Sequence, residues 1–454
     1  MARTKLIIAI LCAATGVFPL LSQNAAPRKL SLEDAISLAA ANNPKVTAAK
    51  ARQAETKAGV QSARSSLFPK IGASETVIDS TDPVFSFGAR LRQGHFTAAD
   101  LSLHNLNYPS ATADFTSTAG ATWMLFDSGR TLTQMRAART ENAAAAEQTA
   151  AVQQSIAFEV IRAYYRALLA DQEKITTKAA LARATGFAKQ AHDRVDAGMA
   201  LPADGMQADV EVSQREQESA EAESNARMAY AQLAGVLGDA SKQYSLIAPA
   251  GTPEKVLPSL EELQARAMRV RPDLMAAQKE ILASRHSVKA SREAYGPQIS
   301  TFGNVQADNP RLTGGGNTNW TVGAKAEVQL FDGGQRRSQL SKAKAQSELA
   351  EADYQQAEIQ AGIQVRQAYY NQQAAARQYG ISDEMLKKTR ETLRTSLDRY
   401  SAGLVTITEV LREQEQLRFM ELTRVQSLYQ WWIADAQLRL ATGQINAGIF
   451  GVHP

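Results

Sequence analysis

The chain has 454 residues, enough for two or three ordinary domains, but its aromatic content of 6% is low for a compact enzyme core. Its 50 basic and 46 acidic side chains leave a formal net charge of +4, with both signs interspersed along the sequence. This balance gives little reason to expect a nucleic-acid partner. The sequence has no nucleophile motif, phosphate loop or spaced His/Cys cluster, so we expect neither an enzyme nor a bound cofactor or metal.

The first 26 residues are typical of a secretory signal peptide. Arg3 and Lys5 precede an apolar stretch over residues 6–21, and Ala25-Ala26 offers small residues for cleavage. That stretch is short for a transmembrane helix. Cys12, the only cysteine, lies inside it, so we expect a mature protein without disulfides or a lipid anchor.

The rest of the sequence is a tandem duplication. Short segments recur 228 residues later near the start of each half and 205 residues later farther on: Ser31-Leu32-Glu33 as Ser259-Leu260-Glu261, Pro69 as Pro297, Tyr164-Tyr165 as Tyr369-Tyr370, and Gly198 as Gly403. The change of offset places 23 extra residues in the first half. The sequence therefore predicts a first repeat over 27–257, a second over 258–443 and a tail over 444–454.

Each half predicts the same order of elements. In the first, a short helix to about residue 41 precedes a helix over 44–67, because proline is tolerated in a first turn and Pro69 ends the segment. Strands are expected over 70–78 and 115–125. A proline-free helix over 128–196 follows, then a turn at Gly198 and a return helix over 202–237.

The second half repeats this order, with strands over 298–305 and 320–330 and helices over 335–400 and 406–440. The segment 320–330 alternates cleanly between apolar and polar residues, with Trp320 and Val322 on the apolar face. Eleven such residues are enough for a tilted strand to cross a bilayer. An amphipathic strand of a soluble sandwich is the alternative, but two strands per half are too few for a sandwich. The long helices would each extend about 100 Å.

Four strands cannot close a membrane barrel alone. Unpaired strand edges are not tolerated in lipid, and the smallest barrels have about eight strands. Copies of the chain must therefore associate, with eight strands in a dimer or twelve in a trimer.

These features together resemble the TolC-type outer-membrane efflux protein family. The resemblance rests on the duplicated halves, the Leu-Phe-Asp-x-Gly junctions, the Ala-Tyr-Tyr segments and the two glycine turns. It implies an α+β membrane protein whose homotrimer forms a 12-stranded barrel in outer-membrane lipid and a helical tunnel in the periplasm. It also implies a passive exit duct for efflux or secretion, served by a periplasmic adaptor protein and an inner-membrane pump of RND, ABC or MFS type.

The two strand-to-helix junctions are predicted to be structural. In each junction an aspartate can accept hydrogen bonds from the first free helix N–H groups, and a glycine permits a sharp turn. The residues are Phe126, Asp127 and Gly129 in the first half and Phe331, Asp332 and Gly334 in the second.

The two glycine turns are the candidate functional site. The resemblance makes these turns the closed tip, with adaptor-docking grooves around Arg194, Gly198, Arg399 and Gly403. It also implies a pore or tip gate at Glu409, Asp204, Tyr400 and Arg412, in which Tyr400 helps to hold the tip closed. A ring of three Glu409 carboxylates would attract cations. However, Arg412 stands where a second acid is expected and Val405 where an arginine is expected, and Glu409 and Arg412 could simply pair on one helix face.

The 23 extra residues fall within 79–113 and are predicted to form an outer loop without an assigned function. His95 and His104 in this segment lack further obvious metal ligands. A periplasmic coiled-coil adaptor or structural protein without a membrane barrel is the alternative for the whole chain.

Overall fold

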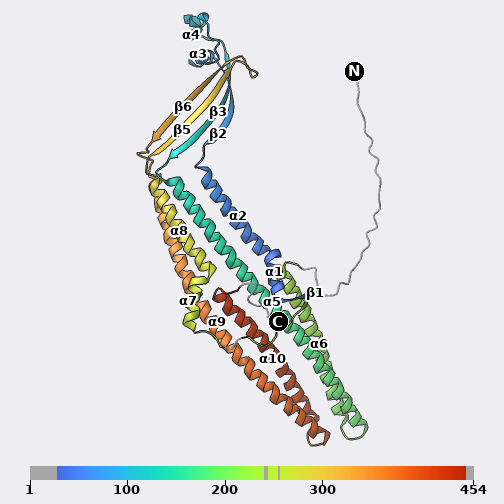
Figure 1. Cartoon of the computed structure of the whole chain (residues 1–454). Coiled ribbons are helices and arrows are strands. Elements are labelled where there is room, and N and C mark those ends of the chain that lie inside the picture. Colours follow the sequence, from blue (N-terminus) through green and yellow to red (C-terminus); the bar gives the residue numbers. More distant parts are fainter. Residues whose placement is uncertain (1–27, 240–243, 254–255, 446–454) are drawn as a thin grey trace, which may run out of the picture.

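The computed structural model describes residues 28–239, 244–253 and 256–445. The predicted signal peptide and all of the predicted tail beyond Ile445 lie outside the described residues. The molecule is elongated, with a β-sheet toward one end and two helical hairpins at the other (Figure 1).

The first repeat begins with two helices whose starts are set by local capping. Ser31 accepts a hydrogen bond from the Asp34 N–H at 3.1 Å, and Pro44 occupies the first turn of the second helix. The helices and strands of this half are α1 (Leu32–Asn42), α2 (Pro44–Ser65), β2 (Lys70–Ser80), α3 (Pro83–Arg92), α4 (Leu103–Asn107), β3 (Thr112–Phe126), α5 (Arg130–Asp196) and α6 (Pro202–Leu237).

The second repeat reproduces these bounds with little change. Its elements are α7 (Leu260–Val270), α8 (Pro272–Glu293), β5 (Gln298–Asn309), β6 (Asn317–Glu327), α9 (Gln335–Ser401) and α10 (Ile407–Ala441). Helices α7 and α8 match α1 and α2 residue for residue at the offset of 228. Helix α9 matches α5 at the offset of 205, so the duplication inferred from short motifs extends to the helix ends.

Four strands form one antiparallel sheet in the order β2-β3-β5-β6. The two faces of the sheet differ in chemistry, and successive rows of register partners point to opposite faces. One row is apolar and consists of Ala73, Ala119, Val305 and Trp320; the next is polar and consists of Ser74, Thr118, Gln306 and Asn319. Within the described part of the chain, β2 and β6 each pair on one side only, so both sheet edges are open.

The last strand differs from its prediction at both ends. It begins three residues earlier than expected, at Asn317, and ends at Glu327, so Val328 and Leu330 lie outside it. The apolar–polar alternation of the sequence continues past Glu327, although the chain leaves the sheet there and turns toward the next helix. The segment expected as an outer loop contains α3, a 3₁₀ turn (Ala98–Leu101) and α4.

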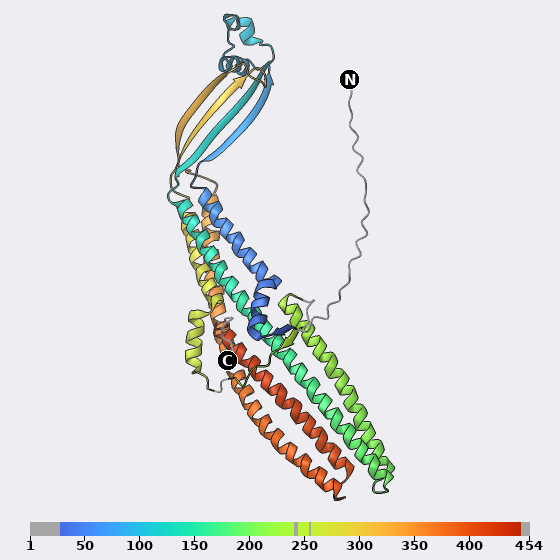
Figure 2. The same cartoon turned by 45° about the vertical axis from the view of Figure 1, so that its right-hand side comes forward.

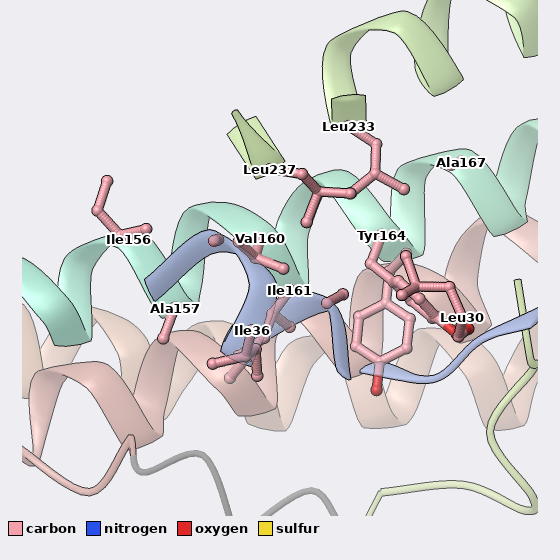
Figure 3. Packing of buried hydrophobic residues seen from close by; sticks show 14 of the residues in the cluster. Leu30, Ile36, Ile156, Ala157, Val160, Ile161, Tyr164, Ala167, Leu233 and Leu237 are labelled. Carbon is pink, nitrogen blue, oxygen red and sulfur yellow. The ribbon is translucent and has the colours of Figure 1, made fainter. Parts of the chain in front are cut away.

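The core lies where α1, α5, α6 and α10 meet. Figure 3 shows Val160 and Ile161 of α5 beside Ile36 of α1, and Tyr164 of α5 beside Leu30. A short parallel pair that the sequence did not predict, β1 (Arg28–Leu30) and β4 (Tyr244–Leu246), joins the start of the first repeat to the segment between α6 and α7. The Tyr164 hydroxyl ties this pair to the core, since it lies 2.8 Å from the carbonyl oxygen of Leu30.

The long helices pack largely through small residues. Many of the buried side chains of α5 are alanines, which lets neighbouring helices approach closely. Among the described helices, none carries an apolar stretch long enough to span a bilayer.

Candidate functional site at the helical tip

The two glycine turns have the same geometry. Gly198 has a φ of 71°, and the Met199 N–H donates to the Arg194 carbonyl at 2.8 Å. In the second turn Gly403 has a φ of 73°, and the Leu404 N–H donates to the Arg399 carbonyl at 2.9 Å. Both are left-handed helix terminations that favour glycine. Each turn joins two antiparallel helices, and both turns lie at the end of the molecule away from the sheet (Figure 2).

The two arginines beside these turns have different surroundings. Arg194 donates from Nη1 to the carbonyl oxygens of Tyr400 and Ser401, both at 3.3 Å, so it links the first hairpin to the second. Its guanidinium carbon lies 4.9 Å from the centre of the Tyr400 ring, within cation–π range. Arg399, its counterpart in the repeat, has an exposed side chain. The two arginines are equivalent in the repeat, but only Arg194 links the hairpins in this way.

Tyr400 is buried between the hairpins. Its side chain is 5% exposed, and its ring centre lies 5.5 Å from that of Phe187 on α5. Burial raises the pKa of the Tyr400 phenol, while the nearby Arg194 cation partly opposes that shift. Val405, which stands where an arginine was expected, packs against the same apolar cluster. The junction is therefore an aromatic and apolar contact with one cation.

The two acids after the turns occupy equivalent first-turn positions of α6 and α10. Asp204 accepts from the Leu201 N–H at 3.0 Å, which stabilises the start of α6. Glu409 lies half-buried in the first turn of α10. Arg412 donates to Glu413 at 3.2 Å, and no Glu409–Arg412 pair forms in the described part of the chain. The structure therefore does not contain the simple surface pair that the spacing allowed.

A network of charged side chains away from the turns joins α6 to α10, and sequence reasoning missed it. Arg215 of α6 is almost fully buried; its Nη1 donates to Glu218 at 2.6 Å, and its Nη2 lies 2.9 Å from Glu415 of α10. Arg418 also pairs with Glu415 and lies 3.5 Å from Glu218. The hydrogen bond and charge of Arg418 hold the pKa of Glu415 below its usual range. These residues follow no motif, so only the packing of α6 against α10 reveals them.

Sequence reasoning also missed a histidine–aspartate pair across the first hairpin. His192 Nε2 lies 3.0 Å from Asp209 Oδ1, and this hydrogen bond raises the pKa of the imidazole. Gly205 makes room for the ring, since an added Cβ would lie 2.9 Å from its Cε1 atom. The signal was available, because residues equidistant from the turn in an antiparallel hairpin face each other.

The strand-to-helix junctions both use an aspartate near the start of the following helix. Asp127 Oδ2 accepts from the Thr131 N–H at 2.7 Å, and Gly129 has a φ of 90°. Asp332 Oδ2 accepts from the Arg336 N–H at 3.1 Å, and Gly334 also has a φ of 90°. Phe126 and Phe331 are both exposed. These residues lie far from the tip, between the sheet and the helices, where they set the direction of the chain.

Solved structures share this architecture. The chain superposes on a crystal structure of CusC with a TM-score of 0.77. The two chains are 20% identical, and the superposition covers 91% of this chain and 92% of CusC. For the MtrE outer membrane channel of Neisseria gonorrhoeae the TM-score is 0.73, at 18% identity over 91% and 88%. A sheet with one apolar face, joined to two long helical hairpins, is thus the chain fold of outer-membrane channels.

The chain belongs to the outer membrane efflux protein family, whose model matches residues 35–239 and 263–444. Among curated relatives, Protein CyaE of Bordetella pertussis is 29% identical over 297 residues, which cover 64% of this chain and 63% of CyaE. Outer membrane protein OprJ of Pseudomonas aeruginosa is 27% identical over 235 residues, covering 50% and 49%. The match thus spans less than two thirds of these relatives. The predicted family, fold class and outer-membrane location are confirmed.

Proposed function

We propose that the protein is the outer-membrane exit duct of a tripartite efflux or secretion system, and that it acts as a homotrimer. The proposal rests mainly on the sheet, which combines one apolar face with two open edges, at β2 and β6. In lipid such edges must pair, so β2 of one copy would pair with β6 of the next until the ring closes. Three copies give twelve strands, consistent with the efflux family to which the chain belongs.

The helical hairpins would then form the periplasmic part of the duct. The tip turns around Arg194, Gly198, Arg399 and Gly403 are proposed to dock a periplasmic adaptor. Glu409, Asp204 and Arg412 are proposed to lie at the mouth, and the buried Tyr400 to help hold the tip closed. Transport through such a duct needs no catalytic group, because an inner-membrane pump supplies the energy. The relatives named for efflux, such as Outer membrane efflux protein BepC of Brucella suis, support the channel over the coiled-coil adaptor that the sequence left open.

The test is the native mass of the protein extracted by detergent from the outer-membrane fraction, followed by conductance in planar lipid bilayers. A trimer that forms pores is the expected result. A dimer would imply an eight-stranded barrel and correct the copy number. A soluble monomer from the periplasm, with no pore activity, would overturn the channel.

A further inference from the structure

Residues 81–111, which connect β2 to β3, form a small folded unit. Asp82 caps α3 by accepting from the Phe85 N–H at 2.7 Å. Phe87 of α3 packs edge-on against Phe96, with ring centres 4.8 Å apart. Arg90 of α3 pairs with Asp100 and donates to Ser110 at 2.9 Å. We call this unit the cap. Its own core and internal ion pair distinguish it from an irregular loop.

The cap lies at the end of the sheet farthest from the helical hairpins (Figures 1 and 2). It contacts strands other than the two that it connects. Arg92 at the end of α3 lies 3.3 Å from Asp308 of β5, and Gly94 lies against Asn317 at the start of β6. His95 reaches the Gly315 carbonyl in the β5–β6 loop. The cap therefore crosses the end of the sheet from β2 to β6.

A cluster of two buried carboxylates and one partly exposed arginine holds the cap in this position. Arg92 Nη2 lies 3.4 Å from Asp114 of β3 and its Nε lies 3.3 Å from Asp308, and both carboxylates are at most 1% exposed. Gln93 donates to Asp114 at 2.9 Å. Two buried carboxylates repel each other unless a cation lies between them, and Arg92 supplies that cation from the cap.

The cluster also shows which face of the sheet the cap covers. Asp308 is the register partner of Thr116, and Asp114 lies two residues from Thr116, so both aspartates point to the same face. The next polar row on this face contains Thr118 and Gln306, whereas the opposite face carries Trp320 and Val322. In a barrel closed in lipid, the apolar face meets the lipid and the polar face lines the lumen.

We propose that the cap narrows the outer mouth of the duct from the lumen side, held there by Arg92 between Asp114 and Asp308. The proposal rests on the proposed function, since it needs a closed barrel with a lumen. The cap is a second constriction at the opposite end of the molecule from the helical tip. It limits the size of solutes that pass the outer mouth, and release of the Arg92 contact widens that mouth.

The first experiment compares single-channel conductance of wild-type trimers with that of Arg92→Ala. The matched control is Arg311→Ala, which removes the same charge at the same end of the sheet. Arg311 is an exposed residue of the β5–β6 loop. Arg92→Ala is expected to raise the ratio of variant to wild-type conductance above one, and Arg311→Ala to leave it near one. Native mass of each variant shows that trimers persist.

A reversible cross-link then separates the position of the cap from general damage. A Cβ built on Gly94 lies 3.6 Å from the Asn317 Cβ, within the range of disulfides, although a φ of 70° at Gly94 strains any side chain placed there. Cys12, in the predicted signal peptide, is the only native cysteine, so a pair placed by Gly94→Cys and Asn317→Cys meets no other thiol in the expected mature chain. In the Arg92→Ala background, oxidation is expected to return conductance to the wild-type level and reduction to raise it again.

The outcomes distinguish the two proposals. Raised conductance in Arg92→Ala that oxidation reverses supports the cap. Conductance equal to wild type in Arg92→Ala, or raised conductance that the disulfide does not lower, overturns the cap and leaves the channel standing. Wild-type trimers that form no pores overturn the proposed function, and the cap with it.

Discussion

The guanidinium of Arg194 lies 4.9 Å from the centre of the Tyr400 ring and joins the turn of one helical hairpin to the turn of the other. Both residues lie in segments that the duplication makes equivalent, yet the contact runs in one direction only, because Arg399 is exposed. Polar contacts also join the hairpins farther from the turns. They include the ion pairs Arg215–Glu415 and Arg183–Glu421 and the hydrogen bond from Gln426 to Glu173. The hairpins are thus held together at several levels along their length.

Replacement of Arg194 by Ala should loosen the junction at the tip. A cation–π contact contributes about 0.5–1 kcal/mol at exposed sites, and two hydrogen bonds to backbone carbonyls are lost with it. We expect a higher mean conductance in lipid bilayers, since the hairpins separate more easily. Arg399→Ala removes the same charge from the equivalent turn and should change conductance less. The reverse order of effects would show that Arg399, and not Arg194, holds the tip.

Replacement of Arg215 by Ala should lower the thermal stability of the helical region. Glu211, Glu218 and Glu415 would lose the cation of Arg215, although Arg418 stays beside Glu218 and Glu415. The loss should fall below the roughly 3–5 kcal/mol of a fully buried pair, because Glu218 and Glu415 also keep contact with water. Arg227→Ala is the control, since Arg227 is exposed and its pair with Glu223 lies in solvent, where ion pairs contribute little to stability. Thermal unfolding followed by circular dichroism measures both, and equal shifts would rule out a special role for the network.

The pair of His192 and Asp209 predicts a pH response at the tip. Asp209 raises the pKa of His192 above its ordinary value of 6.5, so the folded state binds this proton more tightly than the unfolded state. The stabilisation is fully present below about pH 6.5 and is lost as the pH rises through the folded-state pKa. An NMR titration of His192 should give a higher pKa in wild type than in Asp209→Asn. The same pKa in both would show that the hydrogen bond is absent in solution.

The order of the main helices and strands could be predicted from the sequence because the duplication presents most elements twice. Weak strands such as β2 were placed only because β5 lies 228 residues later, and the bounds of α7, α8 and α9 follow the offset to the residue. The end of β6 was missed because apolar alternation continues past Glu327, where the chain leaves the sheet. Binary patterning describes exposure and carries no information on where pairing stops.

The parts that the sequence did not predict depend on contacts between distant segments. The contact of Arg92 with Asp308 joins residues that lie in different repeats, and the cap has no counterpart in the second half to support an inference. The strands β1 and β4 are three residues each, too short for any periodic signal. At the tip, the positions of the turns were predictable from glycine and the duplication, whereas the direction of the Arg194 contact required the packing of both hairpins.

The apolar face of the sheet predicts a difference between neighbouring positions of β6. Val322 lies on the apolar face and is exposed in the single chain, so Val322→Arg would place a charge in lipid at a cost of about 2–4 kcal/mol near the bilayer centre. Thr321→Arg places the same side chain on the polar face and should be tolerated. The yield of trimer in the outer-membrane fraction measures the difference. Equal assembly of both variants would contradict the assignment of the faces.

The two first-turn acids predict different effects on ion selectivity. Asp204 already accepts a hydrogen bond from the Leu201 N–H, so its carboxylate has a structural role at the start of α6. Glu409 has no ion pair among the described residues, which leaves its charge available to ions that approach the tip. A ring of three such carboxylates would favour cations, because acidic rings select cations in channels. Glu409→Gln should therefore lower the cation-to-anion permeability ratio, measured from reversal potentials in a salt gradient, while Asp204→Asn should leave that ratio nearly unchanged. An unaltered ratio in Glu409→Gln would place Glu409 away from the ion path, and a lowered ratio in Asp204→Asn alone would assign the ring to the first repeat.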